Sequence, residues 1–151
     1  MVLPLLTRID HVGIACRDLD RAVALYQATF GLEVASLEVN EEQGVREAML
    51  RVGAPADAGA VVAGLRPGYV QLLEPLSPDT PVGKFLARRG EGLHHVGYEV
   101  ADIREALVTV AGTGIRLVDE RPRHGSMGAS IGFLHPAVLG GVLTDLVQPL
   151  S

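Results

Sequence analysis

Two stretches of the chain show the same order of apolar and polar positions. "IDHVGIACRDLDRAVALY" begins at Ile9, and "LHHVGYEVADIREALVTV" begins at Leu93. Each copy predicts a short apolar strand, an aspartate that caps a helix, and an amphipathic helix that ends near a glycine. The capping aspartates are Asp18 and Asp102, and the glycines are Gly31 and Gly114.

Three further strand-like runs follow each copy, at 33–40, 45–52 and 69–74 in the first half and at 115–119, 129–134 and 142–148 in the second. The order β-α-β-β-β therefore occurs twice, which predicts an α+β fold of two repeated βαβββ modules. We expect the modules at 7–76 and 93–149, joined by a linker at 77–92, in one compact domain. The linker carries a short helix in "PVGKFLARRG". The Ala- and Gly-rich stretch 53–68 has no clear period and predicts a loose hairpin connection.

Composition narrows the class of protein. Hydrophobic residues make up 48% of the 151 positions and charged residues 21%, an ordinary globular balance. The net charge is −5 without a run of Lys or Arg, which argues against a nucleic-acid or membrane surface as partner. The N-terminus lacks a basic region and a cleavage site, and the single cysteine, Cys16, has no internal partner for a disulfide. We therefore expect a cytoplasmic protein with Cys16 in its core.

Polar residues occupy repeat-related positions in otherwise apolar strands. His11 aligns with His95, and "YVQLLEPL" (69–76) aligns with "LTDLVQPL" (143–150), which places Gln71 on Asp145. Two imidazoles, an amide oxygen and a carboxylate oxygen suit a divalent transition ion. Taken singly, a strand histidine is usually a hydrogen-bonded structural residue, and a Gln or Asp near a sheet edge usually faces water. Two repeat-related pairs together favour a metal site.

Two other features fit such a site. Glu47 shares a strand face with Val45 and Met49, the face expected to line the same cavity, although an exposed edge charge is the alternative. "RHGSMGAS" (123–130) is a glycine-bracketed loop whose backbone N–H groups could hold an anionic oxygen, and a solvated turn is the alternative. Its candidate substrate-binding residues are Gly125, Ser126 and Met127. Three histidines lie outside the repeat register and are interpreted as structural or rim residues: His94, His124 and His135. Of these, His124 is also an outside candidate for contact with a ligand.

Longer motifs carry a resemblance to a known family. "IDHVGIA", "EQGVREAML", "LLEPLSPDTPVGKFLARRGEGLHHV", "FLHP" and "GGVL" together resemble the methylmalonyl-CoA epimerases of the vicinal oxygen chelate superfamily, from about Ile9 to Gln148. The resemblance implies two βαβββ modules forming a cupped mixed sheet around a divalent metal. It also implies an isomerase of propionate metabolism that interconverts (R)- and (S)-methylmalonyl-CoA by proton exchange at C2 through a metal-stabilised enolate. The resemblance implies Co²⁺ as the metal, with Zn²⁺, Mn²⁺ or Ni²⁺ as alternatives. It further implies an acyl-CoA substrate and a homodimer.

Carried over by position, the family's metal ligands fall on His11, Gln71, His95 and Asp145, and its bases on Glu47 and Asp145. The last ligand is usually glutamate in this family, so Asp145 is a departure that shortens the side chain by one methylene. Two other functions stay open. One is a glyoxalase I-like lyase or another metal-dependent enzyme of the superfamily, and the other is a non-catalytic binding protein of this fold.

Overall fold

The computed structural model describes residues 5–53 and 66–150, which fall into two compact units. The first unit contains the described residues up to His11 and from His95 onward, and the second contains those from Val12 to His94. The chain therefore leaves the first unit inside strand β1 (Arg8–Ala15) and returns to it inside strand β5 (Gly92–Glu99). The sequence-based division into 7–76, 77–92 and 93–149, as one compact domain, stays a prediction.

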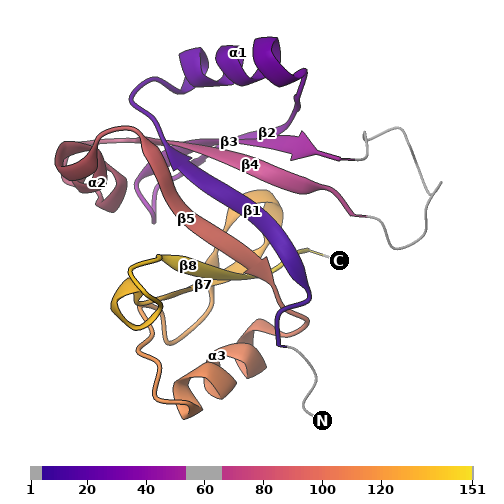
Figure 1. Cartoon of the computed structure of the whole chain (residues 1–151), viewed down its shortest axis with the longest axis vertical. Helices are drawn as coiled ribbons and strands as arrows, with labels where there is room; N and C mark the ends of the chain where they lie inside the picture. Colours follow the sequence, from indigo (N-terminus) through magenta and orange to yellow (C-terminus); the bar gives the residue numbers. More distant parts are fainter. Residues whose placement is uncertain (1–4, 54–65, 151) are drawn as a thin grey trace. The chain divides into compact units, whose positions relative to one another are not determined.

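The second unit holds most of the first module together with the helix of the linker. Its strands lie in the order β2-β3-β4-β1. Helix α1 covers one face of them (Figure 1), and Leu19, Leu50 and Leu72 are fully buried between helix and strands. The side chain of Asp18 accepts a hydrogen bond from the Arg21 N–H at the start of α1, and Gly31 ends the helix with φ 68°. The elements are α1 (Leu19–Phe30), β2 (Glu33–Asn40), β3 (Val45–Val52), β4 (Gly68–Pro75) and α2 (Pro81–Arg89).

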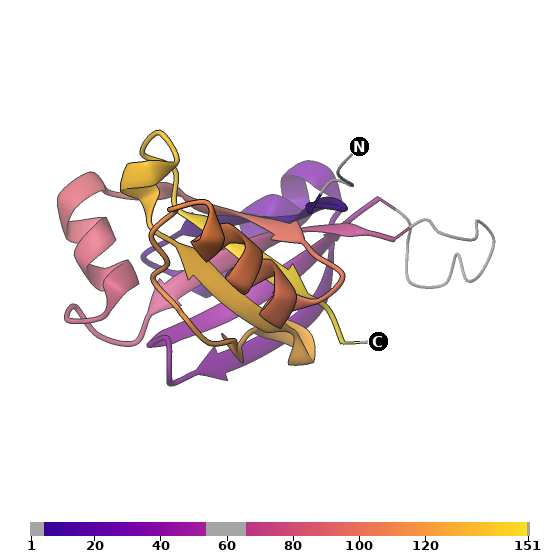
Figure 2. The same ribbon diagram turned by 90° about the horizontal axis from the view of Figure 1, so that it is seen from below.

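The first unit holds most of the second module. Its strands lie in the order β5-β8-β7-β6, with β5 parallel to β8 and β8 antiparallel to β7. Helix α3 packs against β7 and β8 (Figure 2) and buries Ile103 and Leu107 against Leu146. No helix in the described ranges is long and apolar enough to cross a membrane. The elements are α3 (Ile103–Gly112), β6 (Arg123–His124), β7 (Ser130–Leu134) and β8 (Thr144–Gln148).

The predicted α+β class and the βαβββ order of both modules are confirmed, as are the caps at Asp18 and Asp102. The strand predicted at 115–119 is wrong. Only Leu117 makes a bridge there, to Leu134, and the strand in that place is β6. The side chain of Asp119 accepts a hydrogen bond from the Phe133 N–H at 3.0 Å, and this contact replaces a regular ladder. The connection predicted at 53–68 falls largely outside the described residues.

Cys16 lies in the core, as predicted, and its thiol is expected to be unreactive in the folded protein. It is 3% exposed, and burial, assisted by the nearby charge of Glu74, raises the pKa of the thiol to about 12. Because the thiolate is the nucleophile, only about 10⁻⁴ of the thiol is reactive at pH 8. We expect Ellman's reagent to label native protein at least about 10³-fold more slowly than protein unfolded in guanidinium. Rapid, complete labelling of folded protein would show that the Cys16 site opens readily.

Candidate metal centre

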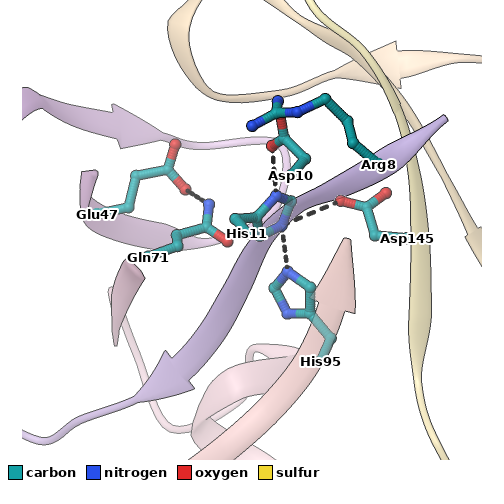
Figure 3. Close-up of polar contacts among 7 residues, drawn as sticks. All are labelled: Arg8, Asp10, His11, Glu47, Gln71, His95 and Asp145. Carbon is teal, nitrogen blue, oxygen red and sulfur yellow. Dashed lines mark hydrogen bonds and ion pairs between the residues drawn. The ribbon is translucent and has the colours of Figure 1, made fainter. Parts of the chain in front are cut away.

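Three buried side chains of the first unit bring their ligand atoms together. His11 comes from β1, His95 from β5 and Asp145 from β8, and they are 5%, 4% and 2% exposed. One ligand atom from each lies within 4.8 Å of the other two. The two imidazoles and the carboxylate point toward one another (Figure 3). The structure thus brings together three of the four ligands predicted from the sequence.

Strand pairing explains why these residues meet. Asp145 of β8 lies opposite Gly97 of β5, which is two residues beyond His95 and therefore on the same face of that strand. The missing side chain at Gly97 leaves room for the ring of His11. A Cβ at this position would overlap Cε1 of His11 and lie 2.5 Å from its Nδ1. Any larger residue at Gly97 would displace the imidazole from the cluster.

The distances between the donor atoms fit a common cation. Nε2 of His11 lies 2.9 Å from Nε2 of His95 and 3.6 Å from Oδ2 of Asp145. Two ligands bound to one ion at about 2.0–2.1 Å, at right angles or wider, are themselves about 3 Å apart. Imidazole nitrogens with a carboxylate oxygen are a donor set typical of divalent transition ions. The residues present therefore fit the metal that the sequence motifs imply.

Asp10 makes a contact with His11 that was not predicted from the sequence. Its Oδ2 lies 2.8 Å from Nδ1 of His11, on the side of the ring away from His95, and its Oδ1 lies 3.6 Å from Nη1 of Arg8. Asp10 is itself 7% exposed, so it is a buried carboxylate next to a buried imidazole (Figure 3). The signal was available as an acidic residue directly before a buried strand histidine, because carboxylates commonly orient metal-binding histidines.

The second unit has a buried polar pair of its own, from two neighbouring strands. Glu47 of β3 and Gln71 of β4 are 2% and 7% exposed. The amide Nε2 of Gln71 donates a hydrogen bond to Oε2 of Glu47 at 3.0 Å (Figure 3). Met49 is the direct partner of Gln71, so the contact to Glu47 is diagonal across the two strands. The amide thus donates through Nε2, and its Oε1 is the atom of this side chain that could accept a hydrogen bond or bind a cation.

The loop predicted to hold an anionic oxygen forms a tight turn in the first unit. Ser126–Gly128 is a short 3₁₀ turn, and Met127 has the left-handed conformation with φ 56° and ψ 34°. The N–H of Gly125 donates to the Ala129 carbonyl at 2.9 Å, and the N–H of Ala129 donates to the Ser126 carbonyl at 3.1 Å. These two amides are therefore engaged within the loop.

The remaining histidines are placed outside the cluster. The ring of His94 packs edge-on against Phe85 with centroids 4.9 Å apart, and burial lowers the pKa of His94 to about 4. Nδ1 of His135 accepts a hydrogen bond from the Ala137 N–H at 3.1 Å and so caps a short turn. His124 is an exposed residue of the two-residue strand β6. His94 and His135 thus have local structural contacts of the kind predicted.

Comparisons with known proteins agree on one family. A model of the Glyoxalase/Bleomycin resistance protein/Dioxygenase superfamily matches residues 10–133. A solved methylmalonyl-CoA epimerase in complex with methylmalonyl-CoA and NH₄⁺ is 50% identical with a TM-score of 0.87, covering 97% of this chain and 96% of that one. A Streptomyces coelicolor methylmalonyl-CoA epimerase with a glutamate changed to glutamine, in complex with 2-nitronate-propionyl-CoA, is 49% identical with a TM-score of 0.87, covering 97% and 99%. The ethylmalonyl-CoA/methylmalonyl-CoA epimerase of Cereibacter sphaeroides is 32% identical, covering 93% of this chain and 97% of its own length.

Proposed function

This chain belongs to the Glyoxalase/Bleomycin resistance protein/Dioxygenase superfamily and, within it, to the methylmalonyl-CoA epimerases, and we propose that it interconverts (R)- and (S)-methylmalonyl-CoA. The observation that carries the proposal is the presence of two kinds of buried polar group. One is a His-His-Asp cluster that fits a divalent ion, and the other is a carboxylate, Glu47, held by an amide. A protein that only binds a ligand does not need a buried acid–base group, because burying a carboxylate is costly.

In this proposal His11, His95 and Asp145 hold the ion, with Gln71 as the fourth ligand. The bound ion supplies Lewis acidity, which lowers the free energy of negative charge on oxygen. The chain's own contribution is to keep the ligand atoms close and out of water. All four proposed ligands are at most 7% exposed, so their electrostatic interactions are stronger than they would be in water.

Glu47 is the proposed base. The hydrogen at C2 lies between a thioester and a carboxylate, and its removal breaks the C–H bond and forms an O–H bond on Glu47. The electron pair moves onto the thioester carbonyl oxygen. The hydrogen bond from Gln71 holds the Glu47 carboxylate in one orientation, which a base must have before it can act efficiently. Asp145 is the proposed acid that returns a proton to the opposite face of C2.

Substrate binding is proposed for the loop of Gly125, Ser126 and Met127. The proposal rests on the glycine-bracketed turn, whose hydroxyl and backbone N–H groups are of the kind that hold an anionic oxygen of an acyl-CoA. The left-handed conformation of Met127 supports a specialised role, because a non-glycine residue rarely adopts it without surrounding constraint.

The identity of the metal, the oligomeric state and the compartment are proposed from ligand chemistry and from the family resemblance. We take Co²⁺ as the native metal, since nitrogen and carboxylate ligands suit it, with Zn²⁺, Mn²⁺ or Ni²⁺ as alternatives. A homodimer acting in propionate metabolism is what the resemblance implies. The free thiol of Cys16 agrees with the reducing conditions of the cytoplasm. Turnover of ethylmalonyl-CoA is a second candidate activity, which the name of the Cereibacter sphaeroides relative favours.

The test is a proton-exchange assay in deuterated water. Protein stripped of metal and reloaded with Co²⁺ or Zn²⁺ is incubated with one enantiomer of methylmalonyl-CoA. We expect deuterium at C2 together with inversion, both depending on the added ion. The same preparation is offered ethylmalonyl-CoA and the hemithioacetal substrate of glyoxalase I. Turnover of the hemithioacetal alone would favour the lyase, and the absence of exchange with every substrate would favour a binding protein.

Lengthening Asp145 to glutamate is expected to preserve metal binding. The family usually has glutamate here, so Asp145→Glu should keep about one ion per chain and leave kcat/KM within about tenfold of the parent. Asp145 is 2% exposed, and the extra methylene is expected to cost about 1–3 kcal/mol in the free energy of unfolding. Metal analysis, steady-state kinetics and denaturant unfolding measure the three quantities. Loss of the metal would mean that the cavity is built around aspartate and that Asp145 does not correspond to the family's last ligand.

A further inference from the structure

We propose that Asp10 is a positioning residue that fixes the ring of His11 for metal binding. This inference rests on the proposed function in one respect, the binding of a divalent ion by the His-His-Asp cluster. It goes beyond that function because it assigns a role to a residue that is neither a ligand nor an acid–base group.

The hydrogen bond between the two side chains selects one form of the imidazole. An ionised carboxylate can only accept hydrogen bonds, so Nδ1 of His11, 2.8 Å from Oδ2 of Asp10, must carry the hydrogen. In the neutral ring Nε2 then carries the lone pair. That atom faces His95 and Asp145, at 2.9 and 3.6 Å. Asp10 therefore leaves His11 with the lone pair on the side where the other ligand atoms converge.

The surroundings of the pair hold it rigidly. Arg8 lies two residues before Asp10 on the same face of β1, and its Nη1 is 3.6 Å from Oδ1. Gly97 lies against the ring of His11 with no space for even a methyl group. Asp10 and His11 are 7% and 5% exposed, so water competes little for their hydrogen bond. The imidazole is thus contacted on one side by Asp10 and on another by the backbone at Gly97.

The second copy of the repeat does not contain the same arrangement. The residue equivalent to Asp10 is His94, and its ring packs against Phe85. A carboxylate directly preceding the metal-binding histidine therefore occurs at His11 and not at His95. A change of Asp10 should therefore lower the affinity for metal through its effect on His11 and not on His95.

Metal titration of metal-stripped protein tests the role directly. We expect Asp10→Asn and Asp10→Ala to weaken Co²⁺ and Zn²⁺ binding by about 10- to 100-fold, with alanine the larger effect, because outer partners of metal-binding histidines contribute on this scale. Asp102→Asn is the matched control, since it makes the same chemical change in the same unit at the cap of α3, where asparagine caps equally well. The control should bind both ions within about twofold of the parent. Unchanged affinity in Asp10→Ala would overturn the proposal.

A second measurement needs no metal, and its decisive result comes from the parent protein. Nitrogen-15 NMR of the metal-free parent protein distinguishes the two neutral tautomers of His11. We expect hydrogen on Nδ1 in the parent and a mixed or reversed population in Asp10→Ala. Hydrogen on Nε2 in the parent would overturn the inference even if the variants misfold. If the parent shows the expected tautomer but binds no ion, the proposed metal-dependent function fails, and with it the metal-binding part of the role assigned to Asp10.

Discussion

The His95→Ala variant is expected to lose divalent-metal binding and at least about 10³-fold of epimerase turnover while remaining folded. His95 supplies the nitrogen nearest to the donor atom of His11, at 2.9 Å, so its removal leaves two of the three clustered ligands. Loss of the ion removes several kcal/mol of charge stabilisation, and each 1.4 kcal/mol is about tenfold in rate. The ring also packs on His11 and Phe133, so we expect a cost of about 1–3 kcal/mol in the free energy of unfolding.

Three measurements separate these effects. Metal content after dialysis reports the site, the inversion rate of methylmalonyl-CoA reports catalysis, and denaturant unfolding reports stability. His135→Ala is the control, because it removes a histidine of the same unit that caps a turn away from the cluster. It should retain the ion and the activity. Full turnover by metal-free His95→Ala would exclude the ion as the source of charge stabilisation.

Glu47→Gln is expected to lower turnover by about 10² or more and to leave metal content and substrate affinity nearly unchanged. Glutamine has the size of glutamate, and its carbonyl can still accept the hydrogen bond that Gln71 donates to Glu47. What it lacks is the ability to accept the C2 proton. Loss of a positioned general base costs about 10²–10⁴-fold. The decrease should therefore appear in kcat rather than in KM.

Exchange and inversion should separate in this variant. With one acid–base group on each face of C2, Glu47→Gln is expected to exchange deuterium into one enantiomer while failing to invert it. The control is Glu74→Gln in the neighbouring strand, where the side chain accepts a hydrogen bond from the Leu19 N–H at 2.6 Å and an amide oxygen can do the same. Its turnover should stay within about threefold. An unchanged inversion rate in Glu47→Gln would leave Asp145 or a water molecule as the base.

The parts of the fold with a strong periodic pattern were predictable from the sequence. The boundaries of β2 and β3 match the predicted runs 33–40 and 45–52. The pair of histidines was found from the repeat alone, since two copies of one motif mark equivalent positions. The convergence of His11, His95 and Asp145 then followed from strand parity.

Strand alternation alone does not predict contacts that depend on register or that are exceptions to parity. Neighbouring residues of a strand point to opposite faces, so the alternation rule gives no reason to join Asp10 to His11. The diagonal contact between Glu47 and Gln71 requires the exact pairing of β3 with β4, which no local pattern specifies. At 115–119 the apolar pattern favoured a strand, but the side chain of Asp119 took the hydrogen bond of the facing backbone.

The three clustered ligands come from the beginning, the middle and the end of the chain, on β1, β5 and β8. The cluster is complete only when all three strands have been synthesised and have paired. An ion held by all three ligands would therefore be bound only after β8 has paired with β5. Once bound, the ion joins segments that are distant in sequence, and closing such long loops removes conformational freedom from the unfolded chain. If the proposed ion binds there, the supply of metal would affect how long each folded molecule survives.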